Sequence, residues 1–109
     1  MRSVPFDALT VEDQRVLLAS ARQLGVDLTR TARGMGWPRL RRETVTDNDE
    51  RALDGLCHGF CVVPPRVGSA ARESLWAAFF VGVDSVTAQE AAATEAEVAS
   101  GVRQRRPRE

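Results

Sequence analysis

The sequence contains no lysine and no tyrosine, so that all fifteen basic residues are arginine. Without lysine, the chain has no Schiff-base nucleophile, no lysine for a phosphate-binding loop and no Ser/Lys catalytic pair. Arginine without lysine, together with plentiful alanine, valine and glycine, is most simply explained by a GC-rich bacterial genome. Individual arginines are therefore not read as selected for bidentate chemistry.

Long apolar runs are also missing. The longest, Leu75–Val83, is too short to span a bilayer, and the N-terminal sequence MRSVPFDALT lacks the apolar run of a signal peptide. We expect a cytoplasmic protein without membrane contact, whose two cysteines are reduced thiols. A chain of 109 residues that is 43% hydrophobic is enough for one modest core.

The formal net charge of zero conceals two segregated blocks. Residues 22–42 carry six arginines against Asp27 alone, whereas residues 43–54 carry five acids against Arg51. Overall neutrality argues against a strongly basic nucleic-acid-binding protein. The local excess of arginine keeps nucleic-acid binding open for the first block.

Capping residues and apolar residues at helical spacing predict helices through most of the chain, and no alternating pattern predicts a strand. Thr10 and either Thr46 or Asp47 are suited to N-caps, and Thr87 with Glu90 offers a further capping box. The expected helices cover about residues 11–24 (ending at Gly25), 28–34 (capped by Asp27 and stopped by Gly34 and Gly36), a short stretch from Pro38, 48–61, the region around Leu75–Val83, and 88–101.

The broadest apolar face belongs to the helix around Leu75–Val83, which we place at the centre of the core. Residues 88–101 are rich in alanine and glutamate, with Val98 as nearly the only sizeable apolar residue, so this helix buries little in its own domain. We expect an all-α fold, a single small domain of five to six helices. Its core occupies residues 1–86, and an Ala-rich helical arm with an Arg-rich tail occupies residues 87–109.

Residues 27–46 read DLTRTARGMGWPRLRRETVT, two short predicted helices joined by a glycine-containing turn. Ala32 and Gly36 are four residues apart, and Met35 and Trp37 flank the turn. This segment resembles the helix-turn-helix family of DNA-binding domains, in which a small residue of the first helix and a turn glycine let the second helix pack closely. The resemblance implies that Met35 and Trp37 occupy core positions.

The resemblance also implies a recognition helix over Pro38–Val45. The residues implied to contact duplex DNA are Arg39, Arg41 and Arg42 in the groove or on its phosphates, with Arg30 and Arg33 on the backbone. The sequence departs from the family where Arg42 stands in place of a branched apolar residue. In an alternative interpretation, the glycines only end helices, and the arginines form a solvated face that pairs with the acids at residues 47–54.

The segment DGLCHGFC brings together Asp54, Cys57, His58 and Cys61. A structural zinc site normally joins two separated ligand pairs, and there is no second pair here. Both cysteines share a helical stripe with apolar neighbours, which favours buried thiols, and Asp54 is spaced to pair with His58. We expect no catalytic residues, no metal and no cofactor, and keep a thiol or metal site as a third and weakest hypothesis.

Two functions remain open. The first is a small helical DNA-binding regulator or accessory protein, of the kind carried by mobile elements or phages. The second is a helical protein-interaction module, such as a subunit, adaptor or inhibitor, that docks on another protein or on a copy of itself through the C-terminal helix or the Trp76/Phe79/Phe80 face. No small-molecule substrate is expected. The tail residues available for contacts with phosphates or an acidic protein are Arg103, Arg105, Arg106 and Arg108.

Overall fold

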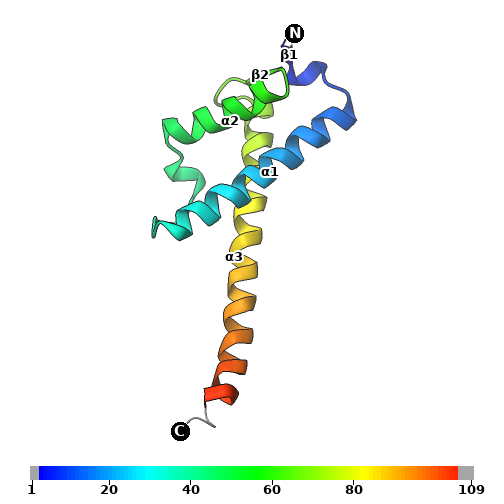
Figure 1. Ribbon diagram of the computed structural model, residues 1–109. Coiled ribbons are helices and arrows are strands. Elements are labelled where there is room, and N and C mark those ends of the chain that lie inside the picture. Colours follow the sequence, from blue (N-terminus) through cyan, green and yellow to red (C-terminus); the bar gives the residue numbers. More distant parts are fainter. Residues whose placement is uncertain (1–2, 106–109) are drawn as a thin grey trace.

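Three α-helices make up most of the chain: α1 (Val11–Gly34), α2 (Asp47–Gly59) and α3 (Ala70–Arg105). The structure, a computed structural model, describes the backbone of residues 3–105 and the side chains of residues 3–93 and 95. Helix α1 crosses the N-terminal half of α3, and α2 lies alongside them (Figure 1). The expected all-α class is confirmed in this coarse form, but the described residues form three α-helices instead of five or six.

Two predicted helix boundaries are wrong, because α1 continues through Gly25 and α3 continues through Thr87. The side chains expected to cap new helices are used inside existing ones. Asp27 Oδ1 accepts a hydrogen bond from Gln23 Nε2 at 3.0 Å, and Thr87 Oγ1 donates to the carbonyl of Val83 at 3.2 Å. The division expected between residues 86 and 87 therefore falls within one continuous helix.

The helices α1 and α3 cross with their backbones in contact at two glycines. A Cβ atom on Gly25 would lie 2.0 Å from the carbonyl oxygen of Phe79, and one on Gly82 would lie 2.0 Å from that of Arg22. A side chain at either position would push the helices apart. Gly25 is thus a packing contact and not the helix end that the sequence suggested, which explains why α1 does not stop there.

Helix α1 ends as expected at Gly34, in a Schellman motif. Gly36 has a φ of 70° and donates to the carbonyl of Arg33 at 3.1 Å, and Trp37 N–H donates to the carbonyl of Ala32 at 2.8 Å. Proline disfavours a helical conformation in the residue before it, so the chain leaves the motif in a non-helical segment. The helix predicted from Pro38 is therefore wrong, and the segment holds the single 3₁₀ turn η2 (Arg42–Thr44).

Helix α2 begins at the predicted N-cap, Thr46. Its Oγ1 accepts from the N–H of Asp49 at 3.3 Å, and the carboxylate of Asp49 accepts from the N–H of Thr46 at 2.9 Å, which completes a capping box. The helix ends at Gly59, two residues earlier than expected.

A two-residue parallel strand pair, which the sequence did not predict, joins the N-terminal segment to the end of α2. Strand β1 (Val4–Pro5), followed by the 3₁₀ turn η1 (Phe6–Ala8), pairs with β2 (Val62–Val63). The N–H of Val4 also donates to the carbonyl of Cys61 at 3.0 Å. Strands this short show no alternation of polar and apolar residues.

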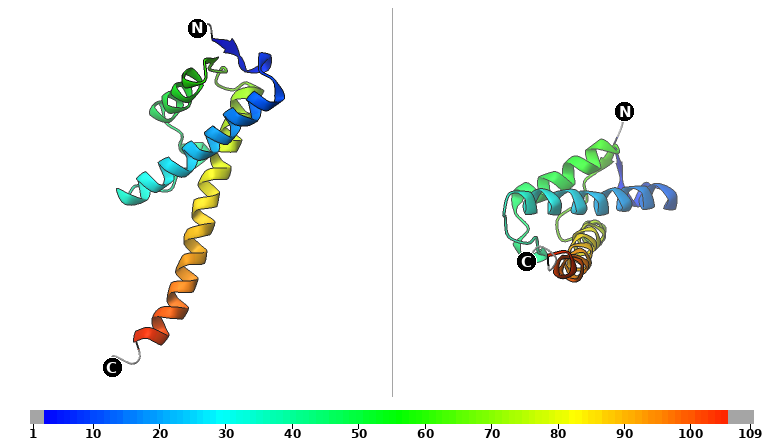
Figure 2. Two further views of the ribbon diagram at one scale, coloured as in Figure 1. Left: turned by 45° about the vertical axis from the view of Figure 1, so that its right-hand side comes forward. Right: turned by 60° about the horizontal axis from the view of Figure 1, so that its bottom comes forward.

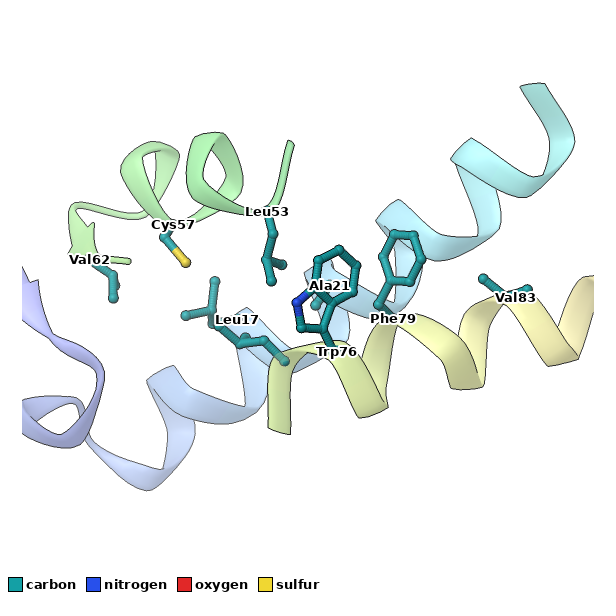
Figure 3. Packing of buried hydrophobic residues seen from close by; sticks show 9 residues of the cluster. Leu17, Ala21, Leu53, Cys57, Val62, Trp76, Phe79 and Val83 are labelled. Carbon is teal, nitrogen blue, oxygen red and sulfur yellow. The ribbon is translucent and has the colours of Figure 1, made fainter. Parts of the chain in front are cut away.

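All three helices contribute to one core (Figure 3). Trp76 and Phe79 of α3 lie at its centre with ring centroids 5.0 Å apart in an edge-to-face arrangement. The expected centre of the core is therefore confirmed. Since Trp76 and Phe79 are buried, however, the Trp76/Phe79/Phe80 face is not the docking surface that the sequence suggested. The remaining core residues are Leu17, Ala21, Leu53, Cys57, Val62, Leu75 and Val83.

A buried arginine links α3 to α2. The side chain of Arg72 is 1% exposed and donates to Asp54 Oδ1 at 2.6 Å, to Glu50 Oε1 at 2.8 Å and to the carbonyls of Glu50 and Pro65. Trp76 Nε1 donates to the same Glu50 oxygen at 3.0 Å. Burial lowers the pKa of Arg72, but the hydrogen bonds to Asp54 and Glu50 and the negative charges of both acids together raise the pKa above its ordinary value.

Candidate protein-interaction surfaces

Three of the five predicted DNA-contacting arginines form ion pairs with acids of α3. The pairs are Arg33 with Glu90 at 3.1 Å, Arg39 with Asp84 at 3.3 Å, and Arg42 with Glu73 at 2.6 Å. Their partners are not the acids at residues 47–54, so the expected internal pairing is corrected: of those acids, Glu50 and Asp54 pair with Arg72. In the described part of the chain, no ion pair involves the remaining two, Arg30 and Arg41.

These three pairs neutralise charge more than they hold the structure together. Every side chain in them is at least 42% exposed, and exposed pairs contribute about 0–1 kcal/mol each. Arg42 is the most constrained, because its guanidinium carbon also lies 5.4 Å from the ring centroid of Trp76, a cation–π distance.

The geometry that the helix-turn-helix resemblance implied is not formed around Ala32. Ala32 is buried, but Met35 and Trp37, the implied core positions, are 60% and 54% exposed. The predicted recognition helix is replaced by the connecting segment, which we define as residues 35–46 between α1 and α2.

The connecting segment forms one side of a groove of about 660 Å³. Ala32, at the end of α1, lies at the groove together with the apolar part of the connecting segment, and Asn48 and Asp49 line it from the start of α2. The other lining residues are Trp37, Pro38, Arg39, Leu40, Arg41, Thr44 and Thr46. Sequence reasoning missed this groove because it placed Trp37 in the core; an aromatic residue just beyond a glycine stop was the available signal.

The C-terminal part of α3 leaves the rest of the molecule. Among the described residues, the ion pair between Arg33 and Glu90 is the most C-terminal ion pair between α3 and the body, and residues 91–105 continue as helix beyond it (Figure 2). We call residues 91–105 the stalk. Of its described side chains, Ala91, Ala92, Ala93 and Glu95 are exposed. The projection accounts for overall dimensions of 66 × 28 × 23 Å.

The four tail arginines lie outside this description. Arg106 and Arg108 fall beyond the described residues, and the side chains of Arg103 and Arg105 are likewise not described. The predicted contacts of this tail stay a prediction.

The segment with the cysteines and histidine forms no potential metal site among the residues that the structure describes. Cys57 is buried in the core, as expected. The expectation for Cys61 is wrong, because α2 ends at Gly59 and Cys61 follows it, partly buried, in a left-handed conformation with φ 56°. The expected pairing of Asp54 with His58 is not formed, because Asp54 accepts from Arg72. Burial raises the pKa of the Cys57 thiol, Arg72 opposes this shift, and Asp54 adds to it.

We therefore expect Cys57 to react with iodoacetamide at least about tenfold more slowly than Cys61 in the folded protein, since the thiolate is the reactive form. Peptide mass spectrometry at successive times measures both rates. In denaturant the two rates should converge. Equal rates in the folded protein would contradict the burial of Cys57.

Comparison with protein-family models, with curated proteins and with solved structures finds no match for this chain. Within the described range, none of the helices has the combination of length and apolarity needed to cross a membrane.

Proposed function

We propose that the chain is a helical protein-interaction module, such as a subunit, adaptor or inhibitor, that binds its partner through the stalk. The observation that carries the proposal is that α3 continues for 15 residues past Glu90, the site of its most C-terminal described ion pair with the body. At a rise of about 1.5 Å per residue, residues 91–105 project by about 22 Å.

The body holds this helical segment at one end only, so packing on another surface would stabilise its far end. The exposed side chains Ala91, Ala92 and Ala93 add little bulk, which lets a partner approach the helix backbone closely. Glu95 supplies a charge beside them. These features suit a helix that lies in a groove of another protein.

DNA binding through Arg30, Arg33, Arg39, Arg41 and Arg42 is the competing function. The proposal favours protein binding because Arg33, Arg39 and Arg42 already pair with acids of α3. A DNA-binding surface there would require phosphates to displace three carboxylates. A gel-shift assay with duplex DNA at low and high salt tests it directly, since phosphate contacts weaken steeply with salt.

Removing residues 92–109 tests the proposed function. We expect the free energy of unfolding to change by less than about 1 kcal/mol, because the truncated chain keeps the ion pair of Arg33 with Glu90 and all contacts of the body. Urea denaturation measures this. The full chain, used as bait in nuclease-treated extract of the source cells, should retain a partner at a fixed ratio, and the truncated chain should not.

Two results would overturn the proposal. One is a partner that the truncated chain retains as well as the full chain does. The other is a full chain that binds duplex DNA in the gel-shift assay and retains no protein after nuclease treatment. Replacing Arg30 and Arg41 with glutamine then shows whether the DNA contact uses the two arginines that have no described ion pair.

A further inference from the structure

The groove on the connecting segment is an apolar surface that the chain itself leaves open. Trp37 lines the groove and is 54% exposed. Burial of its ring by a binding partner would be favourable, because apolar surface would leave water. Pro38 and Leu40 extend the apolar lining on the same side. A groove of about 660 Å³ with an exposed tryptophan has the character of a binding site for the side of a helix.

The lining of the groove carries two arginines, Arg39 and Arg41, and one acid, Asp49. Residues 28–42 contain five arginines and no acid. Three of the five pair with acids of the same chain's α3, which leaves Arg41 in the groove lining and Arg30 on α1 without a described ion pair. Asp49, the acid in the lining, is held in the capping box of Thr46 and keeps its negative charge, so the lining has an excess of one positive charge. An occupant with carboxylates fits this distribution.

The N-terminal half of the stalk and the turn that precedes it have the matching charge. Residues 87–98 contain three glutamates and no basic residue, and Arg103 and Arg105 follow in the second half of the stalk. Glu90, the first of these glutamates, already pairs with Arg33. An acid of α3 therefore already binds an arginine at the end of α1 within one chain. Glu95, the next, is exposed and has no ion pair in the described part of the structure.

The stalk does not fill the groove of its own chain. Helix α3 passes Arg33 at Glu90 and continues away from the body as one uninterrupted helix. One chain therefore carries two uncovered surfaces in its described part: a groove in which Arg41 has no ion pair, and a helix on which Glu95 has none. We propose that two copies of the chain associate reciprocally, with the stalk of each lying in the groove of the other.

This inference rests on the proposed interaction function and names the partner as a second copy. Reciprocal contacts related by a two-fold axis close the assembly at two copies. A coiled coil between two stalks is a poorer arrangement, because Val98 and Val102 are the only sizeable apolar residues in the sequence of residues 91–105, too few for a continuous apolar seam.

Light scattering coupled to gel filtration, over a wide range of concentrations, tests the inference on the full chain. The expected mass is twice the 11.9 kDa of one chain. Trp37→Ala and Glu95→Arg should each weaken association by at least about tenfold. The double variant Arg41→Glu with Glu95→Arg should restore it, because the swapped charges attract again. Val67→Ala, which shortens another exposed apolar side chain outside the groove, is the matched control and should leave association unchanged.

Each other outcome is decisive. A monomer at every concentration overturns the inference, while a different protein that is retained by the full chain and lost on truncation after residue 91 would leave the proposed function standing. A dimer that truncation abolishes but Trp37→Ala leaves intact means that the stalk binds elsewhere, and it overturns the groove as the site. A dimer that survives truncation removes the stalk from self-association altogether.

Discussion

Replacing Arg72 with alanine is expected to lower the free energy of unfolding by about 3–5 kcal/mol, the usual effect of removing one member of a buried ion pair. The change leaves Glu50, whose side chain is 20% exposed, and the carbonyl of Pro65 without the donors that the buried Arg72 provides. Most small domains are stable by only about 5–15 kcal/mol, so the loss is a large part of the total. Urea denaturation followed by tryptophan fluorescence measures it, because Trp76 donates to the same Glu50 oxygen.

Two further variants show whether the effect belongs to the network. Arg66→Ala removes an exposed arginine that forms no ion pair with any other described residue, and it should change stability by no more than about 0.5 kcal/mol. Arg72→Lys should recover only part of the loss, since a single ammonium does not reproduce the fork that reaches Asp54 and Glu50 together. A loss below 1 kcal/mol for Arg72→Ala, on the scale of an exposed pair, would contradict the buried geometry.

Gly25→Ala should destabilise the protein by about 3 kcal/mol, although alanine is the better helix former. The added Cβ would lie 2.0 Å from the carbonyl oxygen of Phe79, and this backbone atom moves only if α3 moves. Thermal unfolding followed by circular dichroism should show a fall in Tm of more than about 10 °C.

The chain offers a matched control in the middle of α2. Gly55 is exposed, and a Cβ added there would meet nothing within 4 Å. Gly55→Ala should therefore stabilise the protein by about 0.4–1 kcal/mol through the reduced freedom of the unfolded chain. If both substitutions were to shift Tm in the same direction, the close crossing of α1 and α3 would be wrong.

The helix ends that depend only on neighbouring residues could be predicted from the sequence. Thr10 and Thr46 cap α1 and α2 as their hydroxyl groups predict, and Gly36 provides the left-handed residue that stops α1. The apolar spacing around Trp76 identified the centre of the core because a helix with a wide apolar stripe buries that stripe against other elements.

The errors came from residues whose role depends on a distant part of the chain. Gly25 has the same local preferences whether it ends a helix or contacts Phe79, and sequence alone does not separate the two. The sequence does not predict the buried role of Arg72, because a lone arginine in a helix normally faces water. In the structure, Arg72 donates to acids about twenty residues away. The sequence wrongly predicts a helix in the connecting segment, because a proline on its own is compatible with the first turn of a helix. Here the Schellman motif at Gly36 and the restriction that Pro38 places on the residue before it exclude a helix start.

The same reasoning limits what the sequence revealed of the candidate site. The sequence identified the arginines and the C-terminal helix as candidates, but it did not predict that acids of α3 pair with Arg33, Arg39 and Arg42. It also predicted that Trp37 lies in the core. The groove depends on the path of the connecting segment, which is set by packing between helices that are far apart in the sequence.

The close crossing of α1 and α3 has a consequence for synthesis on the ribosome. The principal packing partner of α1 begins at Ala70, so Leu17 and Ala21 are made long before the residues that cover them. Until α3 has been synthesised, the nascent chain displays the apolar stripe of α1 to solvent, where it is a target for chaperones. Folding should then start late and proceed quickly, once the third helix has cleared the exit tunnel.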